Sequence, residues 1–222
     1  MATHVIGDVH GCYRELCELL EMLGPTDDDR LIFVGDLVVR GPENAEVIRL
    51  ILDGGLANVT VLLGNNEEKI RPTLEGDPRY ATPAVLHTIE QLRSSSLLER
   101  ALDLFATFPL SVNLETHAIV HAGVRPGVPL DEQTRDDLLT IKSLGPGPEG
   151  PMWWESYDGP DVIVFGHHVF RDPLVLPTAI GIDTGCVYGG ALTALTLETG
   201  VFTTVRAAET YYRHPGKWHL FV

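Results

Sequence analysis

The sequence predicts an α/β fold in which two β-sheets form a sandwich flanked by helices. Three observations lead to this expectation. Strand-like and helix-like segments alternate in the first third of the chain, strand-like runs dominate the second half, and five of the runs are followed directly by a residue that can bind a metal. With 222 residues, 44% of them hydrophobic, the chain is long enough for one domain with a substantial core.

The first third is expected to contain three parallel strands separated by two helices. The strand-like runs occupy residues 4–6, 31–34 and 59–63. Apolar residues recur at helical spacing over residues 16–23 and again over residues 45–52. Strand–helix–strand units of this length favour right-handed crossovers and parallel pairing.

Residues 67–109 interrupt this alternation. Leucine, isoleucine and phenylalanine residues at helical spacing, broken by prolines, predict a helical insert within a single domain that covers residues 1–222. We interpret the insert as a cover over the carboxyl ends of the strands.

The second half is expected to add five strands. They are residues 118–120, 162–165, 180–182, 191–197 and 201–205. Glu198-Thr199-Gly200 has the composition of a hairpin turn between the last two. The sum of these elements is an α/β domain of two sheets with helices outside.

Composition and charge narrow the possible partners. The net charge of −15 would repel a long nucleic-acid duplex, and no Lys/Arg-rich run is present to override it. A compact anionic substrate remains compatible with this charge if bound cations lie in the site. No apolar run approaches the roughly 20 residues that span a bilayer, so no membrane partner is expected. An odd number of cysteines without zinc spacing, and no leader-like segment, predict reduced thiols in a cytoplasmic protein.

Metal-ligand side chains follow the predicted strands, each within two residues of a glycine. They are Asp8, His10, Asp36, Asn65, His121 and His167. In α/β sheets, ligands bind beyond the carboxyl ends of the strands, so these side chains are expected to meet. Aspartate and histidine suit manganese, iron or zinc, and a carboxylate such as Asp36 can bridge two ions. Two ions about 3.5–4 Å apart can activate a water and hold a phosphoryl group, which predicts a small phosphate ester or anhydride as substrate.

The motifs together resemble the calcineurin-like metallophosphoesterases, and within them the phosphoprotein-phosphatase group. The pattern of that group is GDxHG, GDxxDRG, GNHE, HAG and GH. It is matched, over nearly the whole chain, at residues 7–11, 35–41, 64–67, 121–123 and 166–167. The stretch 181–195 is similar to the bacterial branch that includes symmetrical diadenosine tetraphosphatases and bacterial serine/threonine phosphatases. This resemblance implies the fold of the family and a metal-dependent phosphohydrolase.

The same resemblance implies two divalent ions. One would be held by Asp8, His10 and Asp36, and the other by Asp36, Asn65, His121 and His167. Manganese is the expected metal, with iron, zinc, nickel or cobalt as alternatives. Arg40 and Asn65 would contact the substrate. Arg40 suits this role because a guanidinium fork matches phosphate oxygens. Arg125, directly after the HAG motif, is expected to meet a second phosphate.

Two motif positions depart from the family. Val39 stands where GDxxDRG has its second aspartate, and Asn66 stands where GNHE has histidine. In the family, the histidine is thought to protonate the leaving oxygen and the aspartate to orient it. Asn66 can donate a hydrogen bond to a phosphate oxygen but cannot carry a proton. Loss of a general acid typically costs about 10²–10⁴ in rate.

This loss affects substrates unequally. A serine alkoxide leaves poorly without a proton, whereas a leaving phosphate, with a second pKa of about 6, is a weak base. The preferred reading is therefore a phosphohydrolase of nucleoside polyphosphates such as diadenosine tetraphosphate, with Arg40 and Asn66 acting directly on the substrate. A Ser/Thr or Tyr protein phosphatase is one alternative. A catalytically weak protein that binds phosphate ligands is another, and Asn66 is then either an inactivating change or a specialisation.

Overall fold

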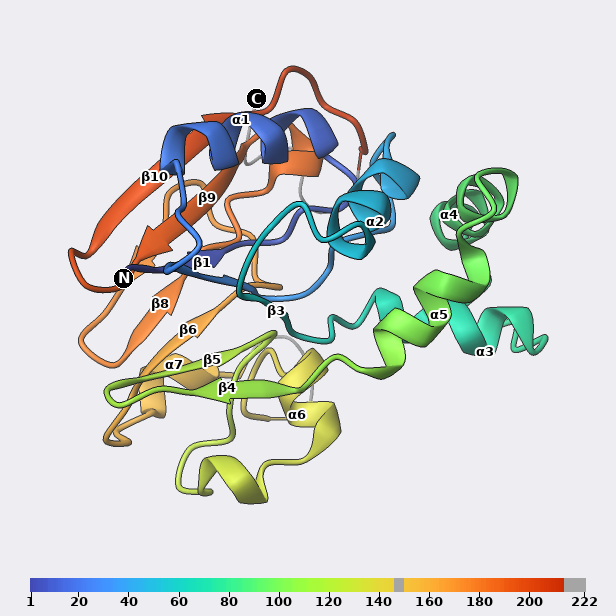
Figure 1. Ribbon diagram of the computed structural model, residues 1–222. Helices are drawn as coiled ribbons and strands as arrows, with labels where there is room; N and C mark the ends of the chain where they lie inside the picture. Colours follow the sequence, from blue (N-terminus) through green and yellow to red (C-terminus); the bar gives the residue numbers. More distant parts are fainter. Residues whose placement is uncertain (146–149, 214–222) are drawn as a thin grey trace.

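The computed structural model describes residues 1–145 and 150–213, which form two five-stranded sheets with helices outside them (Figure 1). This is the predicted α/β sandwich. Within the described residues, no helix is both long and apolar enough to cross a bilayer.

The first sheet has the strand order β10-β9-β1-β2-β3. Its strands are β1 (Thr3–Ile6), β2 (Arg30–Phe33), β3 (Val59–Val61), β9 (Ala191–Thr196) and β10 (Val201–Arg206). The three strands from the first third of the chain pair in parallel, as predicted, and β9 adds antiparallel beside β1. The hairpin between β9 and β10 is also confirmed, since the Gly200 N–H donates to the Thr196 carbonyl at 2.9 Å.

The second sheet has the order β4-β5-β6-β8-β7. Its strands are β4 (Ser111–Asn113), β5 (His117–Val120), β6 (Val162–Phe165), β7 (Leu174–Val175) and β8 (Ala179–Gly181). The central strands β5, β6 and β8 are parallel and match the predicted runs. The edge strands β4 and β7 pair antiparallel and were not predicted, because three and two residues carry too little pattern.

The space between the sheets is filled by aliphatic side chains from both. Val5 and Ile32 from the first sheet pack in one buried cluster with Ile119 and Val164 from the second. A second core lies under the helices α1 (Tyr13–Leu23) and α2 (Asn44–Leu52). Each face of the first sheet is therefore buried, which explains the nearly continuous apolar runs of its parallel strands.

The segment 67–109 is helical, as expected. It contains a 3-10 turn (Glu67–Lys69) and the helices α3 (Ile70–Leu74), α4 (Pro83–Ser94) and α5 (Leu98–Ala106). Figure 1 shows α3, α4 and α5 extending to one side of the sheets, with α4 beside α2. An amide–amide hydrogen bond of 2.7 Å from Asn44 to Gln91 joins these two helices. That the insert covers the strand ends stays a prediction.

Short helices complete the described chain. They are α6 (Arg135–Thr140), α7 (Trp153–Ser156) and the 3-10 turns Leu130–Glu132 and Cys186–Tyr188.

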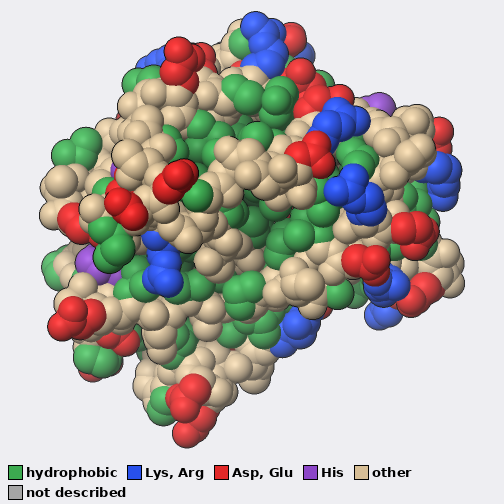
Figure 2. Space-filling view, viewed as in Figure 1, with side chains coloured by type: hydrophobic (Ala, Val, Ile, Leu, Met, Phe, Trp, Pro, Cys, Tyr) green, Lys and Arg blue, Asp and Glu red, His purple; other side chains and the backbone are tan. Residues whose placement is uncertain are grey.

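On the face shown in Figure 2, Lys and Arg side chains lie interspersed with Asp and Glu side chains, in line with exposed ion pairs such as Arg93–Glu90. The expected exclusion of long nucleic acid stays a prediction.

Candidate active site

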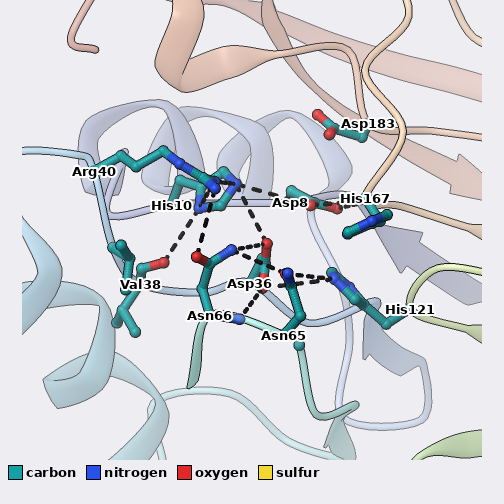
Figure 3. A network of polar contacts seen from close by, with 12 residues as sticks. Asp8, His10, Asp36, Val38, Arg40, Asn65, Asn66, His121, His167 and Asp183 are labelled. Atoms are coloured by element: carbon teal, nitrogen blue, oxygen red, sulfur yellow. Dashed lines mark hydrogen bonds and ion pairs between the residues drawn. The ribbon is translucent and has the colours of Figure 1, made fainter. Parts of the chain in front are cut away.

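The six predicted ligand side chains meet beyond the carboxyl ends of the parallel strands of both sheets (Figure 3). Asp8 and His10 follow β1, Asp36 follows β2, and Asn65 follows β3. The second sheet contributes His121 after β5 and His167 after β6. The site therefore lies where the two sheets meet.

One group consists of Asp8, His10 and Asp36. All three are buried, and one ligand atom from each lies within 4.8 Å of the other two. The His10 Nε2 atom is 3.5 Å from Asp36 Oδ2 and 3.9 Å from Asp8 Oδ2. Two carboxylates and an imidazole at this spacing form a donor set that suits a divalent transition-metal ion.

A second group shares Asp36 with the first. His121 Nε2 lies 3.6 Å from Asp36 Oδ1 and 3.4 Å from Asn65 Oδ1. The His167 ring is 5.1 Å from the His121 ring, centroid to centroid. One oxygen of Asp36 thus faces each group, which is the arrangement required of a bridging carboxylate.

The histidine rings present a lone pair to the site. Nδ1 of His121 lies 2.9 Å from the Val34 carbonyl, and Nδ1 of His10 lies 3.2 Å from the Val38 carbonyl. Because a carbonyl only accepts, Nδ1 carries the hydrogen, and the lone pair that could bind a metal is on Nε2. These carbonyl contacts fix the ring orientation, as second contacts of metal-binding histidines commonly do.

His167 provides a direct test of whether a cation fits. Its Nε2 atom is buried and has no hydrogen-bond partner in the structure. Burial, with the neighbouring His121, lowers the pKa of His167 well below its usual value, so the ring is neutral. A buried nitrogen lone pair without a donor is costly, and a bound cation would satisfy it.

The backbone at the site is held in an unusual conformation. His10, Asp36 and His167 have positive φ angles of 50°, 51° and 61°, and Val39 and Arg40 have 77° and 85°. Each such residue costs about 1–3 kcal/mol and persists only where its surroundings enforce it. The concentration of left-handed residues here indicates that ligand placement, rather than local stability, determines these turns.

Gly64 shows how closely the loops approach one another. A Cβ atom at this position would overlap the backbone nitrogen and the Oδ1 atom of Asp36. Any side chain would therefore displace the shared carboxylate, which accounts for glycine in front of Asn65.

Arg40 reaches over the first group. Its Nη1 donates to His10 Nε2 at 2.6 Å, and Nη2 donates to Asn66 Oδ1 at 3.5 Å. The guanidinium also lies 5.8 Å from the centre of the Tyr188 ring, within the range of a cation–π interaction. The guanidinium fork is therefore held beside the ligand cluster, and its role in phosphate binding stays a prediction.

Asn66 is tied into the ligand cluster. Its side chain is buried, and its amide nitrogen donates to Asp36 Oδ2 and, at 3.1 Å, to Asn65 Oδ1. Its carbonyl oxygen accepts from Lys69 Nζ at 3.1 Å. Val39, the other departure from the family, is buried in the apolar core, so no ionisable group takes the place of the usual aspartate.

Glu67 joins two loops through three backbone hydrogen bonds. Its Oε2 atom accepts from the backbone N–H groups of Asp36 at 3.0 Å and Gly64 at 3.1 Å, and its Oε1 atom accepts from Val38 at 3.0 Å. The carboxylate thereby connects the loop after β2 to the loop after β3. The sequence interpretation gave Glu67 no role of its own, because its partners lie about thirty residues away in the chain.

We expect Glu67→Gln to lower the free energy of unfolding by about 1–3 kcal/mol, because the amide NH₂ would face a backbone N–H that loses its acceptor. Urea unfolding of the metal-free protein measures this change. Glu68→Gln is a matched control, since Glu68 makes only a partly exposed ion pair with Arg135 and its loss should cost at most about 1 kcal/mol. Equal losses for the two variants would contradict the anchoring role.

Arg125 pairs with a carboxylate that is not one of the candidate ligands. Its guanidinium pairs with Asp137, at 2.5 Å from Nη2 to Oδ1 and 3.2 Å from Nε to Oδ2. The Arg125 side chain is 53% exposed, so a phosphate contact stays a prediction that would require this ion pair to rearrange.

The fold also brings together residues that the sequence interpretation kept separate. Cys12 and Cys186 are buried free thiols whose sulfur atoms lie within 4.8 Å of each other and of a Glu15 carboxylate oxygen. No spacing rule could indicate this, because the turn Cys186–Tyr188 reaches the start of α1 only through the tertiary fold. Lys69 and Tyr188, which approach Asn66 and Arg40, were missed for the same reason.

Comparison with known proteins agrees with this geometry. The family model of the calcineurin-like phosphoesterases matches residues 1–191. The chain is 32% identical to the asymmetrical bis(5'-nucleosyl)-tetraphosphatase PrpE of Halalkalibacterium halodurans, over 97% of this chain and 100% of that protein. It is 27% identical to a symmetrical bis(5'-nucleosyl)-tetraphosphatase of a Janthinobacterium species, over 98% of this chain and 100% of that protein.

A solved structure assigned as a candidate diadenosine tetraphosphatase superimposes with a TM-score of 0.77 at 27% identity, covering 93% of both chains. The family model spans the motif residues from Asp8 to His167. In this family two divalent ions serve as cofactors. The chain therefore belongs to the calcineurin-like phosphoesterases and is a metal-dependent phosphohydrolase.

Proposed function

We propose that the chain hydrolyses nucleoside polyphosphates such as diadenosine tetraphosphate. The observation that carries this proposal is the combination of a complete ligand cluster with Asn66 in place of the proton donor. A site that keeps its metal ligands and lacks the acid is suited to leaving groups that need no proton. The names and full-length coverage of the relatives support the same substrate class.

We further propose that the two ions are manganese in the working enzyme. Asp8, His10 and Asp36 would hold one ion, and Asp36, Asn65, His121 and His167 would hold the other. The buried, unpartnered Nε2 of His167 supports this assignment. When bound, two such ions lower the pKa of water and offset charge on a phosphoryl group.

The protein side chains supply orientation and charge. Arg40 would bind two phosphate oxygens through its fork once a substrate displaces it from His10 and Asn66. Tyr188 supports the guanidinium from one face, and burial raises the pKa of Tyr188, so the phenol stays protonated. Asn66 would donate a hydrogen bond to a phosphate oxygen without taking part in proton transfer.

The leaving group determines which substrates are fast. When a phosphoanhydride is cleaved, the departing oxygen belongs to a phosphate whose second pKa is about 6, so it leaves as a stable anion. When phosphoserine is cleaved, an alkoxide must leave, and no group at position 66 can protonate it. The proposed activity is therefore selective for anhydrides and activated esters.

The test is hydrolysis, with manganese, of diadenosine tetraphosphate, 4-nitrophenyl phosphate and a phosphoserine peptide by the purified chain. We expect the highest kcat/KM for the anhydride, and chromatography of the products separates symmetrical cleavage to two ADP from asymmetrical cleavage to ATP and AMP. A higher kcat/KM for the phosphopeptide would replace the proposal with a protein phosphatase. Turnover of none of the three, with metal bound, would indicate a phosphate-binding protein.

Removal of the divalent ions should lower the melting temperature. The ligands come from both sheets, so bound ions would connect β1 and β2 with β5 and β6. A ligand that binds only the folded state adds about 2.7 kcal/mol when present at 100 times its dissociation constant. Scanning calorimetry after chelation and after manganese addition measures the shift, and a variant lacking Asp36 should show little of it. An unchanged melting temperature would argue against ions that connect the sheets.

We also propose that the protein acts in the cytoplasm. Cys12, Cys17 and Cys186 are all unpaired, two of them buried. Free thiols persist in reducing environments, which supports the cytoplasm as the place of action.

A further inference from the structure

Two cations converge on one neutral oxygen beside the ligand cluster. Lys69 Nζ lies 3.1 Å from Asn66 Oδ1, and Arg40 Nη2 lies 3.5 Å from the same atom. Both side chains are half-buried. Within the part of the chain that the structure describes, no ion pair joins either cation to a carboxylate. The pair therefore places two positive charges beside the ligand cluster, where Asp36 and Glu67 are the nearby negative charges.

The position of Lys69 is fixed by the local fold. Residues Glu67–Lys69 form a 3-10 turn directly after Asn66, and the Lys69 N–H donates to the Asn66 carbonyl at 3.3 Å. The carbonyl of Lys69 accepts from the Thr73 hydroxyl at 2.7 Å. One turn of helix thus returns the Lys69 side chain to the side of Asn66, and Glu67 holds that turn against the neighbouring loops.

The positive charges of Lys69 and Arg40 repel one another. Burial lowers the pKa of Lys69, and the nearby Arg40 acts in the same direction, while Asp36 opposes them. A phosphate oxygen placed between the two cations would remove this repulsion, because ionised donors form the strongest hydrogen bonds to phosphate. The structure therefore offers a second anion contact next to Arg40, on the side of Asn66.

We propose that Lys69 is a catalytic residue that donates a hydrogen bond to the leaving oxygen of the substrate. It would supply, as a fixed positive charge, part of the stabilisation that a proton donor at position 66 supplies elsewhere in the family. This inference rests on the proposed function, because charge stabilisation without proton transfer suffices only for a weakly basic leaving group.

Hydrolysis of a phosphoanhydride forms one P–O bond and breaks another. The oxygen of water forms the new bond to phosphorus; one of its two protons passes to bulk water and the other stays on the new phosphate. The bridging P–O bond breaks, and its electron pair stays on the departing phosphate oxygen. Lys69 keeps all three of its protons and offsets the charge that develops on that oxygen.

A purely structural role for Lys69, in which it only holds Asn66, is the main rival. It predicts that loss of the ammonium slows every substrate by the same factor. Stabilisation of the leaving oxygen predicts instead that the loss grows with the basicity of the leaving group.

The experiment compares Lys69→Met and Lys69→Arg with the unaltered chain. The substrates are 2,4-dinitrophenyl, 4-nitrophenyl and phenyl phosphate, whose leaving phenols are successively stronger bases, together with diadenosine tetraphosphate. For Lys69→Met we expect kcat to fall by about 10- to 100-fold with phenyl phosphate, the size of one charged hydrogen bond, and by less with the dinitrophenyl ester. Lys69→Arg should recover part of the loss.

Lys142→Met is the matched control, because this exposed lysine contributes charge near Lys69 and is not among the residues that contact Asn66. It should leave the dependence on leaving group unchanged. Melting temperature and metal content, measured for every variant, separate a folding defect from a kinetic one.

Three results would overturn the proposal. They are an equal loss with all aryl phosphates, no loss at all, and a loss confined to diadenosine tetraphosphate, which would move Lys69 to a distal phosphate. The aryl phosphates test Lys69 even when diadenosine tetraphosphate is not hydrolysed, so failure of the proposed substrate is distinguishable from failure of the proposed residue.

Discussion

Replacement of Asp36 by asparagine is expected to reduce kcat/KM by about 10³-fold or more, since several kcal/mol of transition-state stabilisation depend on the ions it would hold. One oxygen of Asp36 faces His10 at 3.5 Å and the other faces His121 at 3.6 Å. An amide retains the size of the carboxylate, but it removes the negative charge and places an NH₂ group toward one of these neighbours.

Two measurements identify the cause of this loss. Metal analysis of the dialysed variant should show fewer than two ions per chain. The melting temperature without metal measures separately the loss of the hydrogen bonds that Asp36 accepts from Asn66. Asp53→Asn, on the exposed end of α2, is the control and should be silent. If Asp36→Asn retained both ions and most of its activity, the bridging role would be wrong.

Replacement of Asn66 by histidine is expected to accelerate hydrolysis of phenyl phosphate by about 10²-fold, the lower end of what a general acid contributes. We expect only this smaller acceleration because Val39 provides no carboxylate to orient the imidazole of the introduced histidine. Diadenosine tetraphosphate should gain little, because its leaving phosphate needs no proton. Steady-state kinetics on both substrates, with manganese, measures this divergence.

Asn66→Gln is the control for side-chain size, since it enlarges the residue but keeps an amide that cannot transfer a proton. It should not accelerate phenyl phosphate. The double variant Val39→Asp with Asn66→His should exceed the single variant, because the second carboxylate would hold the imidazole in place. A comparable gain for both substrates in Asn66→His would mean that Asn66 is a simple lesion rather than a specialisation for anhydrides.

The sequence predicted the fold well where strands are buried on both faces. The runs at β1, β2, β5 and β6 were placed within one residue of their observed ends, because continuous apolar runs leave little choice of position. The run at 59–63 was too long, since β3 ends at Val61 and the chain then turns toward the site. The edge strands β4 and β7 could not be predicted, because pairing rather than side-chain pattern defines them.

The same contrast holds for the site. The convergence of the six candidate ligand residues could be predicted because each follows a strand within a few residues, and strand ends converge in a parallel sheet. Contacts that depend on how loops fold over one another could not be predicted from the sequence. Glu67 and Lys69 lie in one short turn. Glu67 binds backbone N–H groups of the loop after β2, and Lys69 contacts the side chain of Asn66, which directly precedes the turn. Arg125 looked available in the sequence, while the fold pairs it with Asp137.

The strand order of the first sheet has a consequence for how the protein is made. The N-terminal strand β1 lies between β2 and β9, and its residue His4 pairs with Thr196 near the other end of the chain. While the nascent chain leaves the ribosome, one side of β1 has no partner until β9 is synthesised. All six ligand residues are in place by His167, before Ala191 begins the closing strand. An apolar edge that stays open this long is a template for association with other chains until β9 pairs with it.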